Sequence, residues 1–462
     1  MKTICILGAG TYGSYIANAL SDKYPGSKIS IIEVGNEHIK SENEIGFLSI
    51  LKQGVYKGTN KGRFFGWGGT SARWGGQLLF FSENDCPNDK RMDEIKRANI
   101  TYKNTVLKRF FKVVPDLSEY EVEKGLFVKQ GIWLKISHRN LFTFFKLKSK
   151  KNIQVLSGAR AVKLNIHDQK IISVTIKRGD RREDINADIF YLTCGAFESL
   201  RLLSVSGIID LEKSSDGFSD HASLRSFSIP QSHTKIGNVD FTFKFFNRSM
   251  ITSRIVGEVE GLSFYVHPIF NEKFIFFQML KKLIFKNQFS LRDIYAASTQ
   301  FFHIFPFITS YFFKKKLYVF KNWSINIDIE LDGNENKIVL SNKKDKYGEQ
   351  GIEVFFNLPD TTIAKLTTAK EKIRDILIQN KIPFKEVNEN INLAKLEDIY
   401  HPYNMYNQTK GNSLKEIYNP LSNFFVYHTG ILPRAGGINP TASLFCLIEK
   451  NILEYSLIYT KC

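Results

Sequence analysis

The chain has 462 residues, 43% hydrophobic and 24% charged, a composition of globular proteins that argues against a disordered or fibrous chain. Its 64 Lys+Arg and 46 Asp+Glu leave a net charge of +18, which favours partners that carry phosphate: nucleotides, nucleic acid or an anionic membrane. The length predicts two domains, or one large domain with insertions. The cysteines are scattered, odd in number and without a CxxC pair, which argues against a disulfide scaffold and a zinc site and predicts free thiols in a reducing cytoplasm. They are Cys5, Cys86, Cys194, Cys446 and Cys462.

The first elements predict a strand, a glycine turn and a helix that together bind a dinucleotide. The apolar run at 3–7 is too short for a signal peptide and indicates a buried strand. It stops at a GxGxxG turn over 8–13, and apolar residues at helical spacing follow. A second apolar strand over 29–32 ends in Glu33, at the distance from the last glycine that such a unit requires.

Each residue of this unit has an expected task. Gly8 permits the tight turn, Gly10 lets a pyrophosphate approach the backbone, and Gly13 allows the helix to pack closely on the strand. The phosphates would lie at the helix N-terminus, and Glu33 can accept hydrogen bonds from ribose hydroxyls. An acid at this position disfavours a 2′-phosphate, and therefore NADP.

Two further regions predict parts of the same site. Residues 62–77 combine many glycines with two tryptophans, which is typical of a loop whose main chain lies against a flat ligand. Two apolar strands are expected at 162–166 and 171–176. A fully apolar strand at 189–192 turns through Gly195 into a helix, which indicates a parallel strand of the same sheet as the N-terminus.

The C-terminal part contains the candidate catalytic residues. His401 precedes a proline in a polar, aromatic loop, and a strand over 424–427 leads to His428 and Gly430. Asn439 is a good N-cap and Pro440 suits the first turn of the apolar helix that follows. The N-terminus of this helix would offer N–H groups and partial positive charge to an electron-rich ligand.

In this order, the motifs resemble those of the glucose–methanol–choline (GMC) oxidoreductases, flavoproteins that oxidise alcohols with FAD. The series comprises the GxGxxG with its acid, GGTSARWGG at 68–76, CGAFES at 194–199, Asp220-His221, His401-Pro402 and Asn439-Pro440-Thr441. The resemblance extends from residue 1 to about 455, although nothing between 225 and 330 matches. The strand and turn over 337–348 are similar to part of the family's substrate domain.

The resemblance implies a fold of α/β plus α+β type. A discontinuous Rossmann-like FAD-binding domain would comprise residues 1–85, 150–222 and 400–462. An inserted substrate-binding domain with an antiparallel sheet would comprise residues 86–149 and 223–399.

The resemblance also implies which residues hold FAD. They are Gly8, Gly10, Thr11 and Gly13 for the pyrophosphate, Glu33 for the adenosine ribose, Gly69, Thr70, Trp74 and Gly75 along the pyrophosphate and flavin, Val162 for adenine, Gly430 at a further backbone approach, and Pro440 and Thr441 at the flavin pyrimidine edge. Arg73 stands where some relatives carry the histidine that attaches FAD covalently, so non-covalent FAD is expected.

For catalysis, the resemblance implies that a CH–OH group is oxidised to a carbonyl by hydride transfer to flavin N5. His401 would take the hydroxyl proton, for which a neutral imidazole is suited, and Asn439 would hold the same oxygen by a hydrogen bond. Residues 403–406 depart from the family pattern after this histidine, and His428 replaces an acid. A catalytically silent FAD-binding or scaffold protein, or an NAD-binding dehydrogenase, therefore remain alternative hypotheses.

A basic, phenylalanine-rich insertion over 273–321 carries nine Lys+Arg and one acid. Polar residues and Pro306 within it argue against a membrane span. Peripheral docking on an anionic membrane, and a buried lid or oligomer surface, remain open as alternatives. Clustered rather than spaced aromatics argue against nucleic-acid binding.

The expected substrate is a small-molecule alcohol, sugar-like or lipid-linked, and the expected location is the cytoplasm or the inner face of the membrane. The pattern does not choose among oxygen, a quinone and a protein as the electron acceptor, and it does not predict an oligomeric state.

Overall fold

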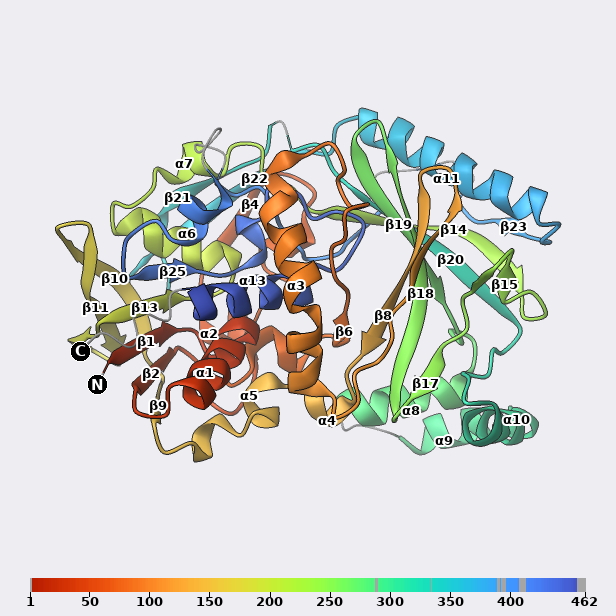
Figure 1. The fold of residues 1–462 in the computed structure, drawn as a ribbon, viewed down its shortest axis with the longest axis horizontal. Helices are drawn as coiled ribbons and strands as arrows, with labels where there is room; N and C mark the ends of the chain where they lie inside the picture. Colours follow the sequence, from red (N-terminus) through yellow and green to blue (C-terminus); the bar gives the residue numbers. More distant parts are fainter. Residues whose placement is uncertain are drawn as a thin grey trace.

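The structure is a computed structural model that describes residues 2–286, 290–333, 335–388, 391, 396–406 and 413–454. Two sheets organise it, a parallel one on the left of Figure 1 and a large antiparallel one on the right. The N-terminus lies beside the parallel sheet, as does the end of the last helix, α13 (Thr441–Glu454).

The parallel sheet collects five short strands from widely separated parts of the chain. Their order is β25-β13-β1-β2-β9, and every neighbouring pair is parallel. The bounds are β1 Thr3–Leu7, β2 Lys28–Glu33, β9 Ile153–Ser157, β13 Ile189–Leu192 and β25 Phe424–Val426. The central strand β1 and its neighbour β13 are almost wholly apolar because helices and a second sheet cover both faces.

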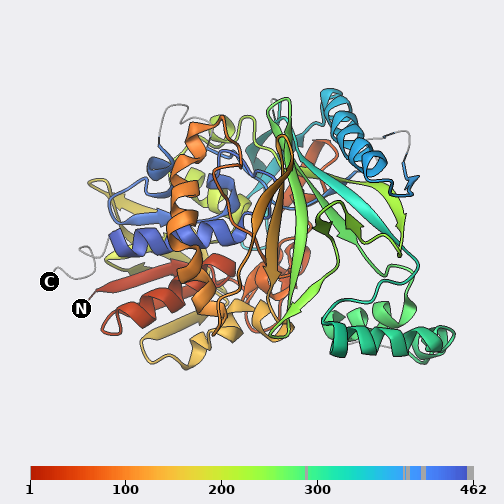
Figure 2. The same ribbon diagram turned by 45° about the vertical axis from the view of Figure 1, so that its right-hand side comes forward.

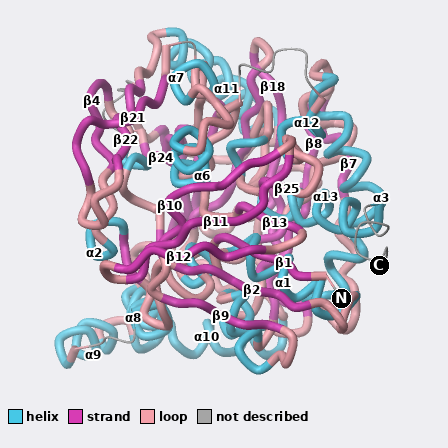
Figure 3. Tube along the Cα trace, turned by 90° about the vertical axis from the view of Figure 1, so that its left-hand side faces the viewer, coloured by secondary structure: helices cyan, strands magenta, loops and turns pink. Residues whose placement is uncertain are grey.

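Helices α1 (Thr11–Lys23) and α13 pack against each other beside this sheet, and α3 (Asp93–Phe110) packs across α13. Short helices complete this part: α2 Glu42–Ile45, α4 Ile136–Arg139, α5 Leu141–Phe144, α6 Ala196–Val205, α7 Leu211–Ser214 and α12 Leu414–Tyr418. An antiparallel meander lies over the parallel strands in Figure 3; its strands are β10 Arg160–His167, β11 Lys170–Arg178 and β12 Arg181–Asn186.

The antiparallel sheet has ten strands, and four of its long strands come from residues 221–269 and 322–330. Its main path is β23 Lys385–Glu386, β14 His221–Pro230, β20 Asn322–Glu330, β19 Leu262–Ile269, β18 Ser249–Val259, β8 Leu126–Trp133 and β6 Gln77–Leu78. Three short strands pair beside it: β7 Glu119–Glu123, β17 Lys244–Phe246 and β24 Glu397–Asp398. Helix α11 (Thr361–Gln379) packs against β18 and β20.

Smaller sheets connect these parts. Strands β21 (Lys337–Lys344) and β22 (Gln350–Phe356) form a hairpin, and β22 pairs in parallel with β4 (Ser49–Gly54). Two-stranded pairs are formed by β3 Lys40–Ser41 with β5 Phe64–Phe65, and by β15 Lys235–Ile236 with β16 Val239–Asp240.

The phenylalanine-rich segment forms a group of short helices at one end of the antiparallel sheet, at the lower right in Figures 1 and 2. These are α8 Ile275–Lys286, α9 Leu291–Ser298, a turn (η5) at Phe301–His303, α10 Ile304–Thr309 and a last turn (η6) at Ser310–Lys314. Within the described residues, every helix is too short or too polar to cross a membrane.

The predicted fold class is confirmed: a parallel sheet with a discontinuous chain path stands beside an inserted antiparallel sheet. The strands expected at 3–7, 29–32, 162–166, 171–176 and 189–192 are all present as parts of β1, β2, β10, β11 and β13. The domain boundaries stay a prediction. Residues 455–462, including Cys462, lie outside the described residues.

Candidate active site

A cavity of about 570 Å³ lies where the carboxyl ends of the parallel strands meet the C-terminal loops. Its walls include eleven of the residues that the sequence selects. They are Gly8, Gly10, Thr11, Glu33, Gly69, Thr70, Trp74, Gly75, His401, Asn439 and Thr441. The cavity size falls within the roughly 300–1,000 Å³ typical of small-molecule sites.

The glycines of the GxGxxG turn have two different tasks: some allow close packing of the fold, and one leaves space for a ligand. Gly8 has a φ of +104°, and a Cβ at Gly13 would stand 1.9 Å from the Gly8 carbonyl oxygen, so these two glycines are required by the fold itself. A Cβ at Gly10 would come no nearer to a protein atom than 4.0 Å. Because Gly10 lines the cavity and precedes α1, the small residue there keeps space for a ligand rather than for protein atoms.

Glu33 joins the glycine loops around this turn. Its two carboxylate oxygens accept hydrogen bonds from the backbone N–H groups of Ala9 at 2.8 Å and of Gly35 and Gly66 at 2.9 Å. Burial raises the pKa of this carboxyl, and the three N–H groups oppose that effect. Glu33 therefore has a structural task that the sequence did not predict, and it still borders the cavity.

A buried guanidinium forms another part of the wall. Arg160 lies 4.1 Å over the ring of Phe47 and donates to Glu198 at 3.2 Å and to Asp345. Burial would raise the pKa of Glu198, but Arg201 and Arg160 hold it at about 2. Sequence reasoning missed Arg160; its only signal is its place at the start of a strand that follows the parallel strand β9.

The backbone at His401 is held in place by the side chain of Asp220. The backbone N–H of His401 donates to Asp220 Oδ1 at 2.9 Å, and the N–H of His221 donates to the same oxygen at 2.7 Å. Asp220 Oδ2 accepts the Tyr56 hydroxyl at 2.7 Å, and burial raises the pKa of Asp220 to about 6. Three hydrogen-bond donors therefore fix the buried carboxyl group of Asp220 beside the loop that carries His401.

The imidazole of His401 is kept neutral by its surroundings. Burial, followed by the nearby His221, lowers the pKa of His401 to about 3. Its Nδ1 is enclosed and has no hydrogen-bond partner among the described residues. Since His401 borders the cavity, Nε2 is the ring nitrogen left to face a ligand there.

Asn439 lies just before α13, which begins at Thr441. Its Oδ1 accepts the Thr441 hydroxyl at 2.9 Å and the Thr441 N–H at 3.3 Å, which caps the helix. With Oδ1 engaged, the amide nitrogen is the group that Asn439 can offer to a ligand. The N-termini of α1 and α13 therefore border one cavity, which suits an electron-rich ligand at both places.

His428 also borders the cavity, where the sequence noted a departure from the family pattern. Its Nε2 lies 2.9 Å from the Tyr406 hydroxyl, and burial lowers the pKa of His428 to about 3. Its ring leaves no space beside Gly430, where a Cβ would be 2.9 Å from His428 Nδ1. His428 therefore places a neutral imidazole at the position where the family pattern has an acid.

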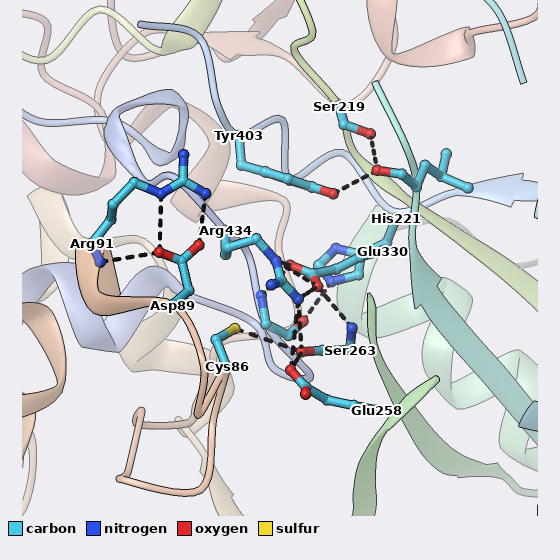
Figure 4. Close-up of polar contacts among 12 residues, drawn as sticks. Cys86, Asp89, Arg91, Ser219, His221, Glu258, Ser263, Glu330, Tyr403 and Arg434 are labelled. Carbon is cyan, nitrogen blue, oxygen red and sulfur yellow. Dashed lines mark hydrogen bonds and ion pairs between the residues drawn. The ribbon is translucent and has the colours of Figure 1, made fainter. Parts of the chain in front are cut away.

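A buried ion pair ties the C-terminal loop to the antiparallel sheet (Figure 4). Arg434 donates through Nε to Glu330 Oε2 at 3.0 Å, and the Gly436 N–H donates to Glu330 Oε1 at 2.7 Å. Burial would raise the pKa of Glu330, but Arg434 lowers it. The Gly436 carbonyl lies 2.8 Å from His221 Nε2, so this ion pair also positions the histidine beside His401.

Polar side chains line one face of the same sheet. His221 pairs with Glu330 and Tyr265 pairs with Asp328 in the strand register, and paired residues point to the same side. Asp328 Oδ2 is 3.2 Å from His267 Nε2, and the guanidinium of Arg254 lies 4.6 Å from the centre of the Tyr265 ring. Arg254 Nη1 and Asp328 Oδ1 are buried without a hydrogen-bond partner among the described residues.

These residues form a polar layer, defined here as His221, Arg254, Tyr265, Asp328 and Glu330. The layer lies close to the candidate base. The ring centres of His401 and His221 are 6.2 Å apart, and those of His221 and Tyr265 are 5.7 Å apart. Sequence reasoning missed the layer, although β20 alternates isoleucine with polar residues, a sign of a strand with one polar face.

Four of the selected residues do not border the cavity: Gly13, Val162, Gly430 and Pro440. Val162 is buried in β10, and its neighbour Ala161 borders the cavity instead. The positions on either side of Pro440, Asn439 and Thr441, also border it. The roles assigned to individual residues stay predictions.

Comparison with known proteins gives a short sequence match and a match of the whole fold. No protein-family model matches the sequence. A 63-residue segment is 40% identical to an oxygen-dependent choline dehydrogenase from Staphylococcus saprophyticus, but the match covers 14% of this chain and 11% of that protein. The crystal structure of pyridoxine 4-oxidase from Mesorbium loti superimposes with a TM-score of 0.59 and 15% sequence identity, over 99% of both chains.

The segment match and the fold match agree with the resemblance inferred from the sequence. The resemblance predicted from the sequence is thereby confirmed: this chain has the fold of the GMC oxidoreductases.

Proposed function

We propose that the protein is an FAD-dependent oxidoreductase that oxidises a CH–OH group of an alcohol to a carbonyl. The observation that carries this proposal is that His401, kept neutral by burial, and Asn439 border the same cavity as the GxGxxG turn. A candidate dinucleotide site and a candidate proton acceptor thus share one cavity. The names of the two similar proteins, a choline dehydrogenase and a pyridoxine 4-oxidase, support this class of reaction.

The residues present fit FAD. The open space at Gly10, the N-terminus of α1 and the close approach of Gly69 to Gly10 would hold a pyrophosphate against main chain. Glu33 and the backbone beside Val162 would bind the adenosine end, and the N-terminus of α13 would face the flavin. When bound, FAD supplies the hydride acceptor at flavin N5. Arg73 stands where some relatives carry the histidine that attaches FAD covalently, which supports non-covalent attachment here.

In the proposed reaction, His401 accepts the hydroxyl proton of the alcohol at Nε2. A neutral imidazole can do this at neutral pH, and burial keeps the ring neutral before substrate enters. Asn439 would donate its amide N–H to the same oxygen, which holds the substrate without competing for the proton. Asp220 does not touch the substrate; it positions His401 through the backbone N–H.

No residue of the polar layer borders the cavity, so the unpaired Arg254 Nη1 and Asp328 Oδ1 are not available to a ligand there. We propose a sugar-like alcohol, free or linked to a lipid, that reaches the enzyme at the cytoplasmic side of a membrane, which is the substrate class expected from the sequence. The electron acceptor is left open among oxygen, a quinone and a protein.

Two measurements on purified protein test the proposal. The bound chromophore is released with acid and identified, and the protein is then titrated anaerobically with sugars, sugar nucleotides, polyprenyl-linked sugars and simple alcohols. Released FAD and bleaching by one of these alcohols support the proposal. FAD that no alcohol reduces would favour a silent binding protein, and bound NAD in place of flavin would favour the dehydrogenase alternative.

A further inference from the structure

The phenylalanine-rich segment has one face packed against the protein and one face exposed. On the packed face, the ring of Phe274 stacks on Phe320 at 5.1 Å and meets Phe307 edge-on at 5.8 Å. Asn271 joins both ends of the segment, donating to the Tyr318 carbonyl at 2.7 Å and accepting from the Phe320 N–H at 2.8 Å. These contacts hold the two ends of the segment together, and the ring of Tyr311 meets Phe245 of β17 edge-on at 4.7 Å, which anchors the segment to the antiparallel sheet.

The other face is strongly apolar and open. Among the described residues, every phenylalanine in the exposed class lies between 301 and 313, and Phe302 and Phe313 are 88% and 84% exposed. The large hydrophobic residues that are at least 65% exposed also all lie in this segment. They are Leu291, Tyr295, Phe301, Phe302, Phe305 and Phe313. Soluble surfaces rarely gather so much apolar area in one place unless it is covered by a partner.

The segment does not close the candidate active site. None of its described residues borders the cavity, and Figures 1 and 2 show α8–α10 beyond the end of the antiparallel sheet. A lid over this cavity, one of the alternatives left open by the sequence, is therefore not what the exposed phenylalanines form.

Charge shows which kind of partner fits. The exposed Lys314 and Lys315 follow Phe313 directly, and the exposed Arg292 follows Leu291. No acidic residue occurs in the sequence from 294 to 327. Apart from Asp293, which follows Arg292 in the sequence, the aromatic rings are bordered by lysine and arginine, and this pattern complements a surface with an apolar interior and negative headgroups.

We propose that residues 291–315 dock on an anionic lipid bilayer, with Phe302, Phe305 and Phe313 in the interface and Lys314 and Lys315 on the headgroups. The docking is peripheral, since every described helix is too short or too polar to span. The proposal rests on the exposed rings and the charge of this segment, and not on the chemistry proposed for the cavity.

Vesicle flotation tests the proposal on the full chain. The vesicles contain phosphatidylcholine alone or phosphatidylcholine with phosphatidylglycerol. The wild-type protein is expected to float with the anionic vesicles and to remain unbound with the neutral ones. The combined variant Phe302→Ser/Phe305→Ser/Phe313→Ser should lower the vesicle partition coefficient by at least about 100-fold. The reason is that three aromatic rings, which would move from water into the bilayer on binding, are replaced by polar side chains. The variant Lys314→Glu/Lys315→Glu should lose the preference for anionic lipid.

A matched control is Ile378→Ser, which removes an exposed apolar side chain from α11, away from the segment, and should leave flotation unchanged. Flotation of the phenylalanine variant equal to that of the wild type would overturn the proposal. So would a wild-type dimer, detected by sedimentation, that the same variant dissociates while neither form binds vesicles, since a second copy would then cover the face. The bound-flavin spectrum of each variant is read separately, so a failure of the proposed chemistry is distinguishable from a failure of docking.

Discussion

The side chain of Asp220 accepts the backbone N–H of His401 at 2.9 Å, although the two residues are 181 positions apart. The contact joins the start of the antiparallel sheet to the loop that carries the candidate base. Because the same carboxyl also holds His221 and Tyr56, the place of His401 depends on a buried group that never reaches the substrate.

Asp220→Ala is expected to slow flavin reduction by substrate about 10- to 100-fold, because two buried backbone N–H groups lose their acceptor and the loop shifts. Asp220→Asn keeps an oxygen for those groups and should retain most of the rate. Rapid mixing under anaerobic conditions measures this step. A rate in Asp220→Ala equal to that of the wild type, with flavin content unchanged, would show that the contact has no positioning role.

The glycine turn offers a matched pair of substitutions. Gly10→Ala adds a methyl group to open cavity space and should abolish flavin binding while leaving the apoprotein's melting temperature close to that of wild-type apoprotein. Gly13→Ala places a methyl group against the Gly8 carbonyl and should destabilise the fold itself. Flavin absorbance and thermal unfolding of the apoproteins separate the two effects. Normal flavin loading of Gly10→Ala would mean that the cofactor lies elsewhere.

Asn439 combines a helix cap with a proposed contact to substrate. Asn439→Ala should lower thermal stability through loss of the cap, by about 0.5–2 kcal/mol, and should also slow flavin reduction. Asn439→Asp keeps the cap, because a carboxylate accepts the same Thr441 groups, but it removes the N–H donor. It should therefore be stable and slow. A fast Asn439→Asp variant would exclude the proposed hydrogen bond to substrate.

Stability should fall as the pH is lowered below about 6.5, the pKa of histidine in an unfolded chain. His401 and His428 have pKa values lowered to about 3 in the folded protein, so the unfolded state binds protons that the folded state excludes. Their stabilising contribution is complete above 6.5 and is lost progressively toward 3. Asp220, raised to about 6, acts in the opposite sense: its contribution is present below about 4 and is lost as the pH rises through 6.

Chemical denaturation at neutral and mildly acidic pH measures this dependence. His428→Asn removes one of the two histidines without removing the candidate base, and should reduce the loss of unfolding free energy between the two pH values. An equal loss in variant and wild type would show that His428 is not held neutral by the fold.

The sequence predicts well what is local. The β1 strand, its glycine turn and α1 follow one another along the chain, and each carries its own signal in apolar spacing or in glycine. The cap at Asn439 is similarly local, since its acceptor and donors lie within two residues.

What the sequence does not predict depends on contacts across the chain. The ion pair of Glu330 with Arg434 joins residues 104 positions apart, and neither residue is unusual in its local sequence. The antiparallel sheet between 225 and 330 was expected only from the resemblance. For the phenylalanine-rich segment, composition shows a large apolar area but cannot show which face the rest of the fold covers.

The most direct test of the central claim is anaerobic reduction of the bound cofactor by an alcohol identified in the screen, in wild type and in His401→Ala. Both proteins should contain FAD. The wild-type flavin should bleach rapidly, and His401→Ala should bleach about 100- to 10,000-fold more slowly, because no group takes the hydroxyl proton. His401→Ala with bound FAD and a wild-type rate of bleaching would contradict the account.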